Sequence, residues 1–249
     1  TTGKTRVKLG IDVGLNNIDV TAKGSFKTDR ATFNFSNTDI NVTDVHVDLH
    51  NTDIDIKTLN ASLLDNAVNA DLSGQLNPVK GEGSFDITLN RLQFISGTNR
   101  FEVAPGHEKL KLTYLIKPKK DRLLIPKSYW RFNERPLVVN PVTMPFDFLT
   151  LSGTVPTTLI SSEDLLKSYI TGQFSLKKMQ CDFIADLLSL NTASLSLEQS
   201  SLPVELKYQD GLYINIKKRS DWKIGDGMFT LYPSIVSYKN NLLYVQEAH

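Results

Sequence analysis

Hydrophobic and polar residues alternate along most of this chain, so that every second side chain in these stretches is apolar. A period of two places the apolar side chains on one face of a β-strand and the polar side chains on the other. Such alternation indicates antiparallel strands with one buried and one wet face, because strands buried on both faces are apolar throughout. The clearest alternating runs are residues 7–13, 18–22, 45–49, 54–56, 68–72, 85–89, 110–114, 195–197, 204–208 and 212–216.

Short clusters of Gly, Asn, Asp and Pro separate the runs and indicate turns between neighbouring strands. Examples are His50-Asn51, Ser73-Gly74, Asn77-Pro78 and Gly225-Asp226-Gly227. Turns at this spacing favour many short hairpin-linked strands over a few long ones. The sequence therefore predicts an all-β fold.

The apolar spacing slips at two points, where successive apolar positions are three residues apart instead of two. These points are Val42/Val45 and Ile56/Leu59. A slip of one residue would turn the rest of the strand's apolar set toward the opposite face of the sheet. We therefore expect a β-bulge at each point, which restores the register.

Two segments have features of a short helix. Ser161 can cap a helix over about 162–170, and Gly172 can end it. The segment 181–190 has apolar residues at roughly helical spacing, although an apolar strand pair explains it as well. We expect one or two short helices within the β fold.

Six prolines between residues 117 and 156 mark the least regular part of the sequence. Proline in a sheet is confined to edges, turns and strand starts, so a change of sheet is expected within this stretch. Alternation continues on both sides of it, which favours one elongated β domain over residues 1–249.

The composition is typical of a folded protein whose positive and negative charges are nearly balanced. The 249 residues contain 28 Lys and Arg against 27 Asp and Glu, for a net charge of +1, and 40% are hydrophobic. A near-neutral balance gives no reason to expect a nucleic-acid partner. The apolar content is too high for a disordered segment.

The ends of the sequence and its single cysteine give little information about function. Cys181 has no second cysteine to pair with and is expected to be a small buried hydrophobe. No run of about 18 to 20 apolar residues could span a bilayer, and the first residues do not form a signal peptide. Since alternation begins at Val7, we interpret the chain as a fragment of a longer protein, with any anchor outside it.

The sequence contains no convergent set of reactive groups. His46 and His50 repeat one face of a strand, but no third metal ligand accompanies them. The acidic residues between 39 and 55 lack the loop spacing and the bidentate Glu of a calcium site. No nucleophile elbow or dinucleotide-binding glycine pattern occurs. We expect no enzyme activity, no metal and no cofactor.

Two basic clusters lie next to aromatic residues and have two interpretations, an interface for anionic headgroups or a solvated loop. The first comprises Lys117, Lys119, Lys120, Arg122, Lys127 and Arg131, beside Tyr129-Trp130 and Phe132. The second is Lys217-Lys218-Arg219, ahead of Trp222.

Residues 122–240 contain short motifs that resemble the AsmA-like periplasmic proteins, in particular the YdbH-type branch associated with intermembrane phospholipid transport. The motifs are Ile125-Pro126-Lys127-Ser128-Tyr129-Trp130, Leu151-Ser152-Gly153, Ile170-Thr171-Gly172-Gln173-Phe174, Ser201-Leu202-Pro203-Val204-Glu205-Leu206 and Leu231-Tyr232-Pro233. The resemblance covers about half of the chain, and the first half shares only the family's general texture.

The resemblance implies an elongated, curled antiparallel sheet that forms an open hydrophobic groove for phospholipid acyl chains. It also implies the periplasm of a Gram-negative envelope as the location, an inner-membrane anchor outside this chain and envelope proteins as possible partners. If the groove exists, alternation in the first half selects the residues that line it. They are Val45, Val47, Leu49, Ile54, Ile56, Phe85, Ile87 and Leu89.

Two other classes of function stay open at this point. A structural or adhesive β-sandwich without a ligand needs only the alternation, because a closed sandwich and an open groove share the same pattern. A lectin or glycan-directed enzyme needs paired carboxylates beside exposed aromatic residues, and the sequence offers no such set.

Overall fold

The computed structural model describes residues 3–13, 18–35, 38–63, 67–96, 99–103, 109–118, 120–148, 150–163, 165–178, 180–191, 195–209, 211–239 and 242–247. Every regular element in these ranges is a β-strand, and the strands pair in antiparallel fashion. The prediction of an all-β fold built on a curled antiparallel sheet is confirmed.

The chain divides into two compact units. Unit 1 comprises Thr1–Gln93 and Glu108–Ile125, and unit 2 comprises Phe94–His107 and Pro126–His249. The boundary at Ile125 lies inside the proline-rich stretch 117–156, where the sequence predicts a change of sheet. The interpretation of residues 1–249 as one elongated domain stays a prediction.

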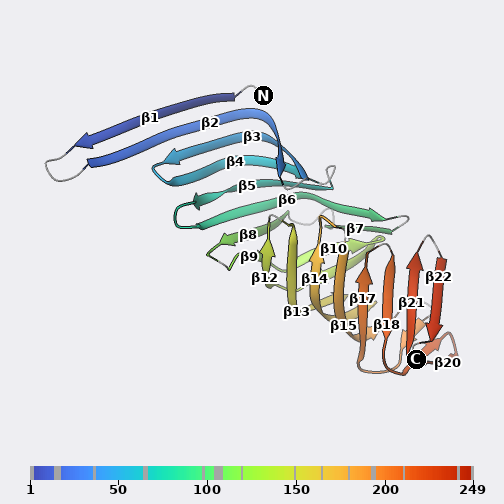
Figure 1. Cartoon of the computed structure of the whole chain (residues 1–249). Helices are drawn as coiled ribbons and strands as arrows, with labels where there is room; N and C mark the ends of the chain where they lie inside the picture. The colour runs from blue at the N-terminus through green and yellow to red at the C-terminus, as the bar shows by residue number, and fades with distance from the viewer. Residues whose placement is uncertain are drawn as a thin grey trace. The chain divides into compact units, whose positions relative to one another are not determined.

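Unit 1 is a single antiparallel sheet in which the first strands follow one another in chain order (Figure 1). The order then skips one strand, because β8 pairs with β6 and β9 pairs with β8. The strands are β1 (Gly3–Val13), β2 (Ile18–Phe35), β3 (Thr38–His50), β4 (Asp53–Leu63), β5 (Val68–Asn77), β6 (Glu82–Ser96, which continues past Gln93 into unit 2), β8 (Leu110–Ile116) and β9 (Arg122–Ile125).

Both bulges expected in unit 1 are present. The register of β3 on β4 shifts between Thr43 and His46, and that of β4 on β5 shifts between Ile56 and Leu59. Val42 and Val45 belong to one buried cluster although they are three residues apart. The bulges therefore keep the apolar residues on one face of the sheet, as predicted.

The main sheet of unit 2 also follows chain order over most of its width (Figure 1). Strand β13 pairs with β14 along one edge, and its other edge is divided between β11 and β12. The strands are β7 (Asn99–Val103), β10 (Ser128–Phe132), β11 (Arg135–Val139), β12 (Val142–Asp147), β13 (Ser152–Ser162), β14 (Leu166–Ser175), β15 (Gln180–Leu190), β17 (Leu202–Tyr208), β18 (Leu212–Ile216), β21 (Ser234–Lys239) and β22 (Leu242–Glu247).

Unit 2 has a second layer, a small sheet formed by β16 (Leu195–Leu197), β19 (Ser220–Ile224) and β20 (Gly227–Leu231). Leu197 and Trp222 of this layer share a buried cluster with residues of the main sheet. The main-sheet members are Ala185, Leu202, Val204 and Ile216. Part of unit 2 is therefore a two-layer sandwich, an arrangement that burial of apolar area stabilises.

The prediction of short helices is wrong. Ser162 is the last residue of β13, and Leu166 already begins β14. The segment Cys181–Leu190 lies within β15, whose backbone pairs with β14 on one edge and with β17 on the other. Cross-strand hydrogen bonds on both edges outweigh a local apolar spacing that suits a helix.

The prediction of a turn at Ser73-Gly74 is also wrong, because both residues lie inside β5. Gly74 is paired with Phe85, and in unit 2 Gly172 is paired in the same way with Phe183. The two glycines have φ values of 154° and 152°. A β-carbon at either position would lie 2.2 Å from the carbonyl oxygen of the residue that precedes the phenylalanine. Glycine is required here for the close approach of two strands.

We expect Gly172→Ala to destabilise the protein by about 1–3 kcal/mol, because alanine at this φ is strained and its methyl group meets backbone. Urea denaturation followed by circular dichroism measures the change. Gly227→Ala is the control, since a β-carbon there lies 3.5 Å from its nearest neighbour. Equal stability of the two variants would contradict the expectation.

Candidate functional site

The eight residues predicted to line a groove all lie on one face of the sheet of unit 1. In one row across the strands, Val47 pairs with Ile56, Ile56 pairs with Gly74, and Gly74 pairs with Phe85. Directly paired residues of antiparallel strands point to the same side of a sheet. The phenylalanine ring fills the space above Gly74, so this row is apolar from β3 to β6.

Neighbouring rows extend the same face. Leu49 pairs with Ile54, and Leu89 pairs with Ala70 and Leu110. Since residues two apart in a strand share a face, Val45 and Ile87 lie on it as well. We use the name apolar face of unit 1 for these residues and the apolar residues aligned with them. The aligned residues are Phe26, Val42, Leu59, Ala61, Ala70, Leu72, Leu76, Leu110, Leu112 and Tyr114.

Burial is uneven over the apolar face of unit 1. Val45 and Leu89 are buried, whereas the other six predicted residues are half-buried. Val42, Val45 and Ala61 pack into a dense cluster with Ala31. Every described strand of unit 1 belongs to this one sheet, so its described residues provide no second layer over the face.

The opposite face of the same sheet is polar and hydrogen-bonded from strand to strand. The Asn60 amide donates to Asp71 at 2.7 Å, and the Asn90 amide donates to the other oxygen of Asp71 at 2.9 Å. The Lys109 ammonium donates to the Asn90 side chain at 2.7 Å. His46 lies 3.2 Å from Asp48 on its own strand. This is a solvated face whose polar groups bond to one another.

The pKa of Asp71 lies below its ordinary value, first because the Asn60 amide donates to it and then because the Asn90 amide does. A carboxyl whose pKa is lower in the folded state adds stability above its unfolded pKa and loses it as the pH falls through the folded pKa. Asn60→Ala should therefore raise the pKa of Asp71. The stability that the Asp71 carboxylate contributes should then be lost at a higher pH. Carboxyl-detected NMR titration measures the pKa.

Asn34→Ala is the control for that titration, because the Asn34 amide bonds to Asp39 instead. The effect on stability is small, since Asp71 is exposed to solvent. An unchanged pKa of Asp71 in Asn60→Ala would show that the amide does not hold the carboxylate.

Two members of the first basic cluster have partners within unit 2. Arg131 lies 3.8 Å from the buried carboxylate of Glu102, and the Lys127 ammonium lies 5.8 Å from the centre of the Tyr129 ring. Trp130 stacks on Phe101. These contacts support a structural role for Lys127 and Arg131. Lys119 of the same cluster lies outside the described residues.

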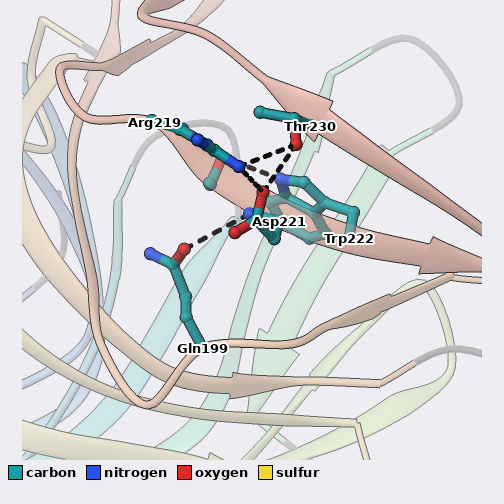
Figure 2. A network of polar contacts seen from close by, with 6 residues as sticks. Gln199, Arg219, Asp221, Trp222 and Thr230 are labelled. Carbon is teal, nitrogen blue, oxygen red and sulfur yellow. Dashed lines mark hydrogen bonds and ion pairs between the residues drawn. The ribbon is translucent and has the colours of Figure 1, made fainter.

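The second basic cluster joins a polar network at the base of the β19–β20 hairpin (Figure 2). The Asp221 carboxylate accepts hydrogen bonds from Thr230 at 2.6 Å and from Arg219 at 3.3 Å. The Asp221 backbone N–H donates to the Gln199 side chain at 3.3 Å. The Thr230 hydroxyl and then Arg219 lower the pKa of Asp221, so the carboxylate keeps its bonds to Thr230 and Arg219 as the pH falls below the ordinary carboxyl range.

Cys181 is half-buried on β15, and burial raises the pKa of its thiol. Within the described ranges, no three His, Cys, Asp or Glu side chains gather in a group that could hold a metal ion. None of the described segments forms a helix of the length and apolarity needed to cross a bilayer.

Sequence reasoning missed the second layer of unit 2. Alternation at Leu195 and Leu197 predicts a strand, but nothing in it indicates that this strand leaves the main sheet. The sequence signal for a buried position here was Trp222. A buried tryptophan needs a partner for its indole N–H, and Ser220, two residues earlier, offers a hydroxyl. The indole N–H donates to the Ser220 hydroxyl at 2.8 Å.

Comparison of the chain with protein-family models, with curated proteins and with solved structures gives no match.

Proposed function

We propose that the chain binds lipid acyl chains along the apolar face of unit 1. The observation that carries this proposal is that the eight predicted residues share one face of the sheet of unit 1. The described residues of unit 1 form no second layer over this face. Six of them are half-buried and so retain surface for a ligand. Each methylene group of an acyl chain that leaves water contributes about 0.8 kcal/mol to the free energy of binding. An acyl chain that lies over several of these residues is therefore held firmly.

The resemblance to AsmA-like proteins extends the proposal from lipid binding to lipid transport. In this proposal the chain is a segment of a periplasmic protein of a Gram-negative envelope, anchored in the inner membrane by a part outside these residues. The groove shields phospholipid acyl chains between the inner and outer membranes, and other envelope proteins can act as partners. Shielding needs no catalytic group, no metal and no cofactor.

Native mass spectrometry of the protein, purified without detergent, tests the proposal. Co-purified phospholipid, identified by its mass after release, is the expected result. A protein that stays free of lipid after expression, and that takes up none from phospholipid vesicles, would contradict it.

A structural or adhesive β module is the second candidate function. The observation that favours it is the sandwich in unit 2, where Leu197 and Trp222 cover part of the main sheet. A face closed in this way needs no ligand. The same mass measurement separates the two candidates, because a structural module gives only the mass of the chain.

A further inference from the structure

Strand β20 is an edge strand in the interior of the chain sequence. Among the described strands it pairs with β19 along one side and with none along the other. Its side chains are open to solvent, with Met228 62% exposed and Phe229 38% exposed. An edge strand presents a row of unpaired backbone N–H and C=O groups, and the group that pairs with such a row is another extended strand.

The turn of the β19–β20 hairpin determines which backbone groups of β20 point to the open edge. Ile224 pairs with Gly227 around a turn of two residues, 225–226. The pair that flanks such a turn exchanges both of its backbone hydrogen bonds, and the pattern then alternates along the strand. The N–H and C=O groups of Met228 and Thr230 therefore point away from β19.

The open edge of β20 has none of the usual protection against pairing. Edge strands are commonly blocked by a charged side chain, a proline or a β-bulge. Residues 227–232 contain no charged residue and no proline, and the register of β20 on β19 is unbroken. The strand is also tied to β19, because the Thr230 hydroxyl donates to Asp221 at 2.6 Å (Figure 2). Pairing at this edge therefore costs little ordering of the chain.

The sequence of β20 is complementary to itself. Two antiparallel copies related by a twofold axis pair only in registers that place one residue opposite its own copy, because paired residues share a face of the sheet. With Thr230 on the axis, Phe229 lies opposite Leu231, and Met228 lies opposite Tyr232, so that each of these large side chains meets another. Thr230 then exchanges both of its backbone hydrogen bonds with its copy. A register with Phe229 on the axis would place Met228 opposite Thr230 and lose these contacts.

We propose that β20 pairs with β20 of a second copy of this chain, antiparallel and with Thr230 on the twofold axis. The small sheets of the two copies then form one continuous layer. A contact confined to two short strands is smaller than a stable interface, which buries about 800 Å² on each partner, so the dimer is weak and depends on concentration. The proposal goes beyond acyl-chain binding, because it concerns unit 2 and the assembly of the protein.

Sedimentation velocity of the purified chain from about 1 μM to about 1 mM tests this proposal, because the range covers weak dissociation constants. We expect the mass to rise from one chain to two with concentration. Met228→Pro should weaken the dimer about tenfold or more, since proline removes an N–H that points to the open edge and leaves the pairing with β19 intact. Met228→Leu keeps this N–H and an apolar side chain, and it should dimerise as the unchanged protein does.

A second pair of variants does not depend on proline. Met228→Lys places a charge at the open edge and should also weaken the dimer. Ile184→Lys is the matched control, because Ile184 is 53% exposed on β15, a strand that is paired on both sides. This control should leave the dimer intact. If circular dichroism shows that Met228→Pro is unfolded, the two lysine variants decide the outcome.

A chain that stays monomeric over the whole concentration range would overturn the proposal. So would a dimer that Met228→Pro and Met228→Lys leave unchanged, or assemblies larger than two chains, since a symmetric pair of edges closes at two. The outcome is independent of the proposed lipid binding. Met228→Pro should lose the dimer and retain co-purified phospholipid in native mass spectra, whereas an intact dimer free of lipid would contradict the proposed function alone.

Discussion

Replacement of Ile87 by aspartate is expected to remove the phospholipid that we propose is bound on unit 1 and to leave the chain folded. Ile87 is half-buried on the apolar face of unit 1, between Leu72 and Leu112. A carboxylate at this position cannot be desolvated by an acyl chain without a large cost, so the lipid is lost. In the absence of lipid the carboxylate reaches water, and we expect a loss of about 1–2 kcal/mol in the free energy of unfolding. Native mass spectrometry and urea denaturation measure the two effects, and Val47→Asp should behave in the same way.

Ser84→Asp provides the matched control, because Ser84 lies on the same strand and is exposed on the polar face. The Ser84→Asp variant carries the same added charge as Ile87→Asp and should retain lipid. Should Ile87→Asp and Val47→Asp unfold the chain, the apolar face is a closed core and the lipid proposal fails. Lipid retained by a folded Ile87→Asp variant would also contradict it.

Truncation of Leu202 to alanine is expected to lower the free energy of unfolding of unit 2 by about 2–5 kcal/mol. Leu202 is 0% exposed and belongs to the cluster that joins the main sheet of unit 2 to its second layer. The cavity left by the truncation cannot be refilled by water or lipid, since both layers close over it. This is the largest stability effect that we expect from a single truncation.

Trp222 lies in the same cluster and reports on its unfolding. Because the chain has only two tryptophans, a Trp130→Phe background leaves Trp222 as the single fluorescent reporter in a denaturation experiment. Ile184→Ala, at an exposed position of β15, should change the stability by no more than about 0.5 kcal/mol. A small effect of Leu202→Ala would mean that the second layer of unit 2 does not pack on the main sheet in solution.

The two substitutions distinguish the two kinds of apolar face in this chain. A charge on the face of unit 1 is expected to affect the ligand more than the fold, and a truncation in unit 2 only the fold. The same period of two in the sequence underlies both faces, so the sequence pattern does not separate a groove from a core, whereas the response to substitution does.

The local features of the sheet in unit 1 were predictable because they follow from side-chain direction alone. The spacing at Val42/Val45 and at Ile56/Leu59 predicts the bulges, since only a bulge keeps these residues on one face. The eight candidate residues share a face for the same reason. Their role as lipid contacts stays a prediction.

The failures of prediction occur where a distant strand overrides the local pattern. The segment Cys181–Leu190 has an apolar spacing that also suits a helix, but pairing with β14 and β17 makes it a strand. Ser73-Gly74 looks like a turn in isolation, whereas Gly74 is needed where Phe85 of the next strand approaches closely. Neither contact is visible in a local window of sequence.

The sequence by itself determined that this chain is built of antiparallel strands, where their register shifts and which residues share a face. Only the tertiary structure decided what lies over each face, namely the second layer of unit 2 and the absence of such a layer among the described strands of unit 1. The physical reason is that alternation records which side chains leave water, while the covering group belongs to residues far away in the chain or to a ligand.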